Sequence, residues 1–153
     1  MFDTCIFGKI LSEKTLEDNI LSSKDEYEYF MTHIQSDELN KTPNAELRER
    51  LMDIFKKIPR NVIATESAVV DVSRIDLAKL SDGQLYSGIF EELNEKKPLQ
   101  EENNIRDALI GETAIKNGIT LVSCDKTLRE IIKKFRGSAV DFKDFTDLMK
   151  HRN

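Results

Sequence analysis

The sequence predicts an α/β fold with a central, mostly parallel sheet of about five strands and helices on both faces, a three-layer α/β/α sandwich. One observation behind this prediction is alternation, because short apolar runs typical of strands take turns along the chain with segments of helical periodicity. Another is length, since 153 residues suffice for a sizeable core without disulfides or a structural metal. We expect one domain over residues 1–153.

The predicted strands are short apolar runs, and the parallel sheet follows from their separation by helical segments. They are MFDTCIF at 1–7, YFMTHIQ at 29–35, NVIATESAVV at 61–70, ITLVS at 119–123 and SAVDF at 138–142.

The segments between these runs carry helical spacing. The clearest is 43–58, where apolar residues recur on one face at Leu47, Leu51, Ile54, Phe55 and Ile58. Residues 12–23 begin with a serine suited to a cap, and residues 103–118 end in Asn-Gly, a typical helix C-terminal signal. The remaining helical predictions are two pieces within 74–97, broken at SDG, and residues 126–135.

The formal net charge of −5 is unevenly distributed along the chain. From Lys126 to Asn153 there are eight basic and four acidic residues, a local net of +4, so residues 1–125 carry −9. The total disfavours a phosphate backbone as a partner, but a basic face and an acidic region can coexist in such a chain.

Composition also bounds location and redox chemistry. No apolar run approaches the roughly 20 residues of a membrane span, and the N-terminus lacks a secretory pattern, so we expect a cytoplasmic protein with no membrane partner. Cys5 and Cys124 fit no zinc spacing and no disulfide framework. We expect two reduced core residues that lie near each other, because each neighbours an acid at a strand end.

Three acidic residues follow predicted strands. Asp3 and Asp125 come at the ends of the first and fourth runs, and Glu38 comes after the second. Open parallel sheets bind ligands beyond the carboxyl ends of their strands, so these carboxylates should converge. Each has a structural alternative: Asp125 as a helix N-cap, Asp3 as a turn residue, and Glu38 as a solvated residue at a helix start, with Asp37 as the inward group.

A fourth acid, Asp107, is predicted on a helix face shared with Ile110, Gly111 and Ala114. A charge on an apolar face is costly unless it is paired or holds a metal. Glu112 lies about 140° around the same helix, which places it off the site or at its margin. His33, within a predicted strand, is expected to be a satisfied core histidine.

Four converging carboxylates without a matching set of buried Lys or Arg would repel one another and raise their pKa values. A hard divalent cation removes that cost. Ligands that are all oxygen suit Mg²⁺ or Mn²⁺, so the sequence predicts a site for one or two such ions.

These residues resemble the PIN domain, found in metal-dependent ribonucleases that include the VapC-type toxins of bacteria and archaea. The resemblance spans essentially the whole chain, and its most specific part runs from Asn104 to Asp125, with LVSCD in the place of the family's LVTxD. It implies a PIN-like nuclease fold and hydrolysis of RNA phosphodiester bonds. Only Met1 and Phe2 precede the first acid, and residues 62–97 have no obvious counterpart in the family.

Carried over residue by residue, the family's acidic site falls on Asp3, Glu38, Asp107 and Asp125, of which Asp3, Asp107 and Asp125 would bind the metal. Thr4 and Ser123 match the hydroxyl residues beside the first and last acids. Arg106, Lys126 and Arg129 would contact the substrate backbone, whereas Lys133 and Lys134 fit a solvated helix surface equally well.

The expected partners are an RNA substrate, a cognate antitoxin if the chain is the toxin of a type II toxin–antitoxin pair, and a second copy in a homodimer. The rival interpretation is a PIN-like module that binds RNA or protein without cleaving. Other phosphate chemistries are poorly supported: FGKI lacks the P-loop spacing, Cys5 stands where a haloacid-dehalogenase-like phosphatase needs an aspartate, and two histidines leave little basis for a Ser/His/Asp hydrolase.

Overall fold

The structure is a computed structural model that describes residues 1–79 and 81–150. Leu80, within the predicted helical region 74–97, and the last three residues of the predicted domain lie outside the described residues. The helices are α1 (Cys5–Ser12), α2 (Lys14–Ser22), α3 (His33–Asn40), α4 (Ala45–Lys57), α5 (Gln84–Lys96), α6 (Glu101–Lys116), α7 (Lys126–Lys134) and α8 (Phe142–Lys150), with a 3-10 turn η1 (Ile75–Leu77).

Several helices begin and end at residues that satisfy their free backbone groups. Thr32 and Gln35 form a capping box at the start of α3, and Asn44 accepts the Leu47 amide at the start of α4. Gly118, with φ of +64°, follows α6 as the Asn-Gly signal predicts.

The strands are shorter than predicted and form two parallel pairs. β1 (Phe30–Met31) pairs with β2 (Asn61–Val62), and β3 (Leu121–Val122) pairs with β4 (Ala139–Val140). A parallel bridge between Phe2 and Val122 adds the N-terminal segment to the second pair. The chain is therefore α/β in a loose sense, and the prediction of one central sheet of about five strands is wrong for the described residues.

The predicted first strand at 1–7 is wrong beyond Asp3. Phe2 makes the bridge, and α1 then begins at Cys5. The reason is that Ile6, Phe7 and Ile10 follow helical spacing, and all three are fully buried on one face of α1.

The predicted strand at 29–35 likewise ends early, because the capping box at Thr32 starts α3. His33 is the first residue of this helix and not a strand residue. The helix α8, which had no counterpart in the sequence interpretation, buries Phe145 and Met149 at a helical spacing of four.

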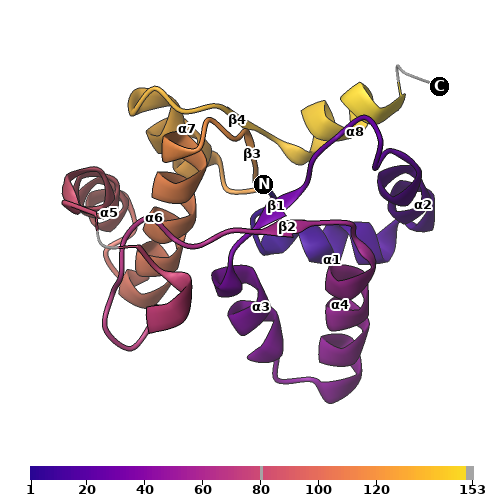
Figure 1. The fold of residues 1–153 in the computed structure, drawn as a ribbon, viewed down its shortest axis with the longest axis horizontal. Helices are drawn as coiled ribbons and strands as arrows, with labels where there is room; N and C mark the ends of the chain where they lie inside the picture. The colour runs from indigo at the N-terminus through magenta and orange to yellow at the C-terminus, as the bar shows by residue number, and fades with distance from the viewer. Residues whose placement is uncertain (80, 151–153) are drawn as a thin grey trace.

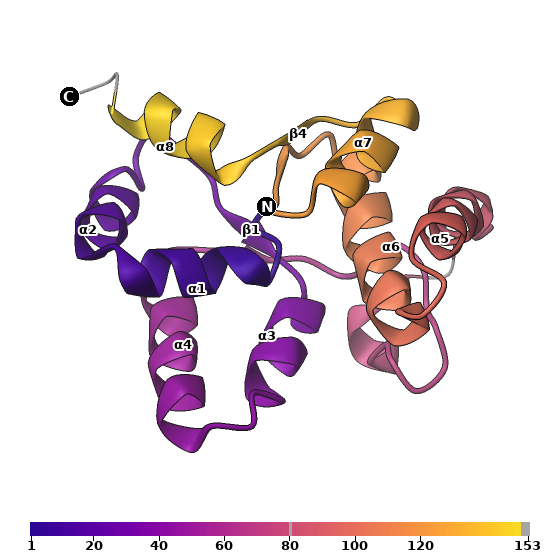
Figure 2. The ribbon, with the colours of Figure 1, turned by 180° about the vertical axis from the view of Figure 1, so that it is seen from behind.

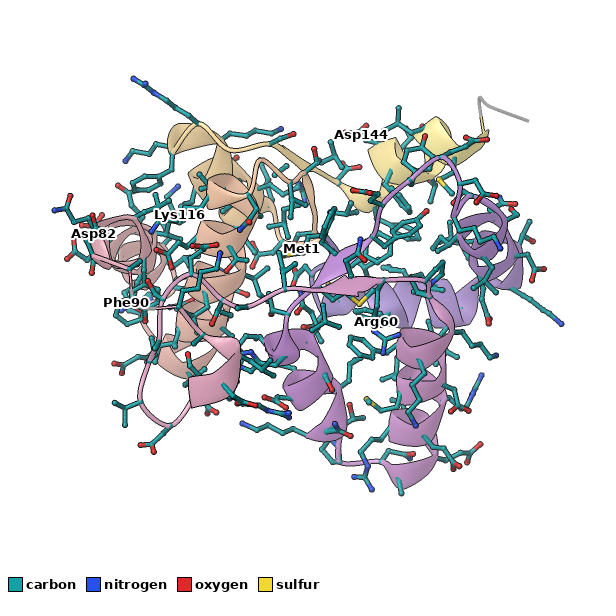
Figure 3. The ribbon with its side chains drawn as sticks, viewed as in Figure 1. Met1, Arg60, Asp82, Phe90, Lys116 and Asp144 are labelled. Atoms are coloured by element: carbon teal, nitrogen blue, oxygen red, sulfur yellow. The ribbon has the colours of Figure 1, made fainter. Side chains whose placement is uncertain are left out.

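Two hydrophobic clusters flank the strands. α5, α6 and α7 lie on one side and α1, α2 and α8 on the other, while α4 packs against α1 and α3 (Figures 1 and 2). Phe7, Ile20 and Phe55 belong to one cluster, and Leu93, Leu109 and Ile132 belong to the other. Figure 3 shows the side chains that fill both sides, with Met1 near the middle of the molecule.

None of the helices in the described part of the chain combines the length and the apolar composition that a membrane crossing requires.

Candidate functional site

The structure brings the four predicted acids to one pocket of about 420 Å³. We call it the acidic pocket; its lining residues are Asp3, Thr4, Cys5, Glu38, Gln100, Asn103, Asp107, Cys124 and Asp125. They come from the start of the chain, from α3, from α6 and its N-cap, and from the loop between β3 and α7.

Asp3 and Asp125 reach the pocket through the pairing of the N-terminal segment with β3. The amide of Asp3 donates to the carbonyl of Val122 at 2.9 Å, and the amide of Val122 donates to the carbonyl of Met1 at 2.9 Å. Both acids follow these paired segments, as the sequence interpretation expects of strand ends.

Ser123 connects these two acids. Its hydroxyl donates to Oδ2 of Asp3 at 2.5 Å and accepts the amide of Asp125 at 3.0 Å. Its side chain is fully buried, so its position is fixed by the fold and not by solvent.

Glu38 lies on α3 and not directly after a strand. The hydroxyl of Thr4 donates to its Oε2, which brings the start of α1 against α3. Burial, followed by the charge of Asp3, raises the pKa of Glu38 although the Thr4 hydrogen bond opposes the shift. The neighbouring Asp37, the alternative inward group, points away and pairs with Arg74.

Asp107 lies on α6, and the face predicted for it is apolar in the structure, with Ile110, Gly111 and Ala114 all buried. The Asp107 side chain is 18% exposed. Burial, and then the charge of Asp3, raises the pKa of Asp107 to about 7, against an ordinary value of 3.8.

Lys97, which sequence reasoning missed, forms ion pairs with two acids of this site. Its Nζ donates to Oδ2 of Asp107 at 3.2 Å and to Oδ2 of Asp125 at 2.5 Å, and its side chain is only 13% exposed. Burial acts to lower the pKa of Lys97, but the hydrogen bond to Asp125 and the charge of Asp107 outweigh burial and raise it.

Asp125 has two roles at once. It is the N-cap of α7, where Oδ1 accepts the Leu128 amide at 3.0 Å, and it also lines the pocket. Burial acts to raise the pKa of Asp125, but the hydrogen bonds from Lys97 and Leu128 outweigh burial and lower it. The roles of Asp125 as a helix N-cap and as a residue of the pocket are therefore compatible.

Two further polar residues of the pocket, Gln100 and Asn103, carried a signal in the sequence. They stand seven and four positions before Asp107, which places them on the same helix face. Nothing comparable marks Lys97, whose approach to the acids depends on how the chain turns at Pro98 between α5 and α6.

The cysteine prediction is half right. The amide of Cys124 donates to Sγ of Cys5 at 3.2 Å, so the two residues are neighbours and free. Both are exposed at the rim of the acidic pocket, so their prediction as core residues is wrong. The loop position of Cys124 and the start of α1 at Cys5 account for the exposure.

The predicted substrate-binding residues lie around the pocket but do not line it. Arg106 is buried, pairs with Glu102 and borders a separate hollow between α3 and residues 71–74. Arg129 donates to the carbonyl of Ser123 at 2.7 Å. Lys126 directly follows Asp125 and is exposed, with Glu130 as its partner at 3.7 Å.

Glu112 and His33, which the sequence analysis places outside the site, do not line the acidic pocket. Glu112 is fully buried against Lys116, whose Nζ is 3.0 Å away, and it does not line the acidic pocket. His33 is buried, and its Nε2 accepts the Arg74 amide at 3.3 Å. Burial lowers the pKa of His33, which keeps the ring neutral.

A larger and more apolar hollow of about 640 Å³ lies at the opposite ends of the strands, lined by residues that precede them, such as Tyr29, Thr120 and Ser138. It contains none of the four acids. The polar groups that converge for chemistry lie in the acidic pocket, so we place the candidate site there.

The side chains of the acidic pocket are all potential oxygen donors apart from the two thiols, which suits a hard cation. As they stand, the described residues contain no group of three His, Cys, Asp or Glu side chains positioned to hold a metal ion. In sequence comparisons, no family model and no curated protein matches the chain.

Proposed function

We propose that the chain is an endoribonuclease of PIN-like fold that hydrolyses RNA phosphodiester bonds with Mg²⁺ or Mn²⁺. The observation that carries this proposal is the convergence of four carboxylates, from separate segments of the chain, on one pocket. The parallel pairing of the N-terminal segment with β3, and of β1 with β2, supports the PIN-like arrangement.

The state of the acids supports a divalent cation. Burial, and after it the charge of Asp3, raises the pKa of both Glu38 and Asp107, so ionisation of these carboxylates is unfavourable and a bound cation would relieve that cost. Asp3, Asp107 and Asp125 would hold the ion. When bound, Mg²⁺ or Mn²⁺ supplies Lewis-acid activation of water and neutralises charge on the reacting phosphate.

The remaining residues of the pocket would orient the carboxylates and exchange protons with the attacking water. Ser123 fixes the Asp3 carboxylate, and Thr4 fixes that of Glu38. Glu38 has a pKa raised mainly by burial, so its carboxylate is suited to accept a proton from the attacking water. Lys126, exposed beside Asp125, would contact a phosphate of the RNA backbone.

One observation favours the rival function, a PIN-like module that binds RNA or protein without cleaving. The Lys97 ammonium lies on two of the acids that an ion would use. In a binding module this ion pair would be permanent and structural.

RNA cleavage tests the two functions against each other. Purified chain is incubated with end-labelled single-stranded RNA in Mg²⁺, in Mn²⁺ or in EDTA. We expect internal cleavage with either ion and none in EDTA. Cleavage undiminished by EDTA contradicts the proposal, and RNA binding without cleavage in any divalent ion supports the binding module.

Membership of a toxin–antitoxin pair is a separate proposal that rests on nuclease activity. Co-expression with the protein of the adjacent reading frame tests it: a cognate antitoxin would co-purify with the chain and suppress RNA cleavage.

A further inference from the structure

The backbone of Lys97 is held in place by α6, which also carries Asp107. Lys97 is the C-cap residue of α5, and its amide donates to the carbonyl of Leu93 at 2.7 Å. Its carbonyl accepts Nδ2 of Asn104 at 2.9 Å, and the same Nδ2 donates to Oδ1 of Asn94 at 2.7 Å. Asn104 is fully buried, so this anchor is part of the fold.

From this anchor, the Lys97 ammonium reaches the oxygens that an ion needs. Oδ1 of Asp125 caps α7, which leaves Oδ2 as the oxygen open to a cation, and Lys97 holds that atom at 2.5 Å. The same ammonium contacts Oδ2 of Asp107 at 3.2 Å. A divalent ion at these two oxygens and the ammonium would repel each other at close range.

We propose that Lys97 is an affinity-determining residue of the metal site: an anchored cation that occupies the Oδ2 atoms of Asp107 and Asp125 in the metal-free chain and must leave them when a divalent ion binds. This inference rests on the proposed function. In it, the Lys97 ammonium competes with the divalent ion for the carboxylates of Asp107 and Asp125. The metal affinity of the chain is then set by the acids and also by the free energy needed to displace Lys97.

Removal of the competitor should strengthen metal binding. In Lys97→Met the side chain keeps its length and loses its charge, so Mn²⁺, titrated by calorimetry or by its spin-resonance signal, should bind about tenfold or more tightly than to wild type. Lys96→Met is the matched control, because Lys96 is the adjacent lysine, is exposed, and changes the net charge equally. Its Mn²⁺ affinity should equal that of wild type.

A second measurement needs no substitution. An amine-acylating reagent applied to the wild-type chain reports on each lysine by mass spectrometry. Lys97 is shielded by its ion pairs and should react slowly in EDTA and faster in saturating Mg²⁺, whereas the exposed Lys96 should react equally in both.

The outcomes separate this inference from the proposed function. If wild type binds Mn²⁺ and cleaves RNA, but Lys97→Met binds Mn²⁺ no more tightly and Mg²⁺ leaves Lys97 acylation unchanged, the inference is wrong and the nuclease stands. If wild type binds no Mn²⁺ and cleaves no RNA, both are wrong. Tighter binding to Lys97→Met with faster acylation of Lys97 in Mg²⁺ supports the inference.

Discussion

At the scale of single residues, the pocket is organised by hydrogen bonds, of which the sequence predicts only some. Ser123 and Thr4 each hold one acid, and Lys97 bridges two others. The positions of Ser123 and Thr4 follow from their place beside acids in the chain. That of Lys97 does not, because it depends on how Asn104 anchors the end of α5.

Asp107→Asn tests the raised pKa of Asp107. The folded, metal-free chain keeps a proton on Asp107 up to about pH 7, whereas the ordinary value of the group is 3.8. Folding therefore takes up a proton between these values, and stability is lost as the pH rises through them. Because Asn does not titrate, stability should shift in favour of the variant by about 2–4 kcal/mol across this range.

Urea unfolding in EDTA at a series of pH values measures this difference. If the stabilities of wild type and Asp107→Asn ran parallel from about pH 4 to about pH 8, the buried, protonated state of Asp107 would be excluded.

Ser123→Ala tests the connection between Asp3 and Asp125. The variant leaves a buried carboxylate oxygen and the Asp125 amide without their partner, so we expect a loss of about 1–3 kcal/mol in the free energy of unfolding. Ser138→Ala is the control, because Ser138 is exposed and its loss should cost less than about 0.5 kcal/mol. Equal costs at the two positions would argue against the Ser123 network.

At the scale of elements, α6 carries Asp107 into the pocket, and α7 begins there at its Asp125 cap. Their close approach depends on Gly111, where an added Cβ would lie 2.5 Å from Cδ1 of the fully buried Ile132. Gly8, in the middle of α1, has nothing within 4 Å of the same atom.

The two glycines should therefore respond in opposite directions to alanine. Gly111→Ala should destabilise the chain by about 0.5–2 kcal/mol, because overpacking against the buried Ile132 outweighs the gain in helix propensity. Gly8→Ala should stabilise it by about 0.5–1 kcal/mol, because alanine is the better helix former and nothing obstructs it. Chemical unfolding of both variants measures this, and a stabilising Gly111→Ala would contradict the packing of α6 on α7.

The elements also show where sequence reasoning succeeds and fails. The helix with Asp107 could be predicted from its Asn-Gly end, and the strand before Asp125 from a short, β-branched apolar run between turn signals. The start of α1 could not, since Phe2, Ile6 and Phe7 suit a strand as well as a helix until Ile10 is considered. The extent of the sheet was overestimated because apolar runs of five to ten residues contain strands of only two.

At the scale of the whole molecule, the acids connect the two hydrophobic clusters. Asp3 follows Phe2, which belongs to the cluster with α1 and α4, and Asp107 precedes Ala108, which belongs to the cluster with α5 and α7. An ion held by both carboxylates would link the two sides of the molecule.

Metal binding should therefore raise the thermal stability of the entire chain. At Mn²⁺ concentrations about 100 times the dissociation constant, the native state gains about 2.7 kcal/mol, which corresponds to a rise of roughly 5–10 °C in the unfolding midpoint. The rise should disappear in Asp107→Asn. An equal rise in that variant would place the bound ion outside the acidic pocket.

Whether the four acids form a metal-dependent nuclease site is decided by the rate of RNA cleavage in Mn²⁺ by Asp107→Asn beside wild type. Glu112→Gln is the control, because Glu112 is a buried carboxylate on the same helix outside the pocket. We predict that Asp107→Asn lowers the rate by about 100-fold or more, while Glu112→Gln, if folded, keeps it. Full activity in a folded Asp107→Asn would show that the four acids do not form the nuclease site.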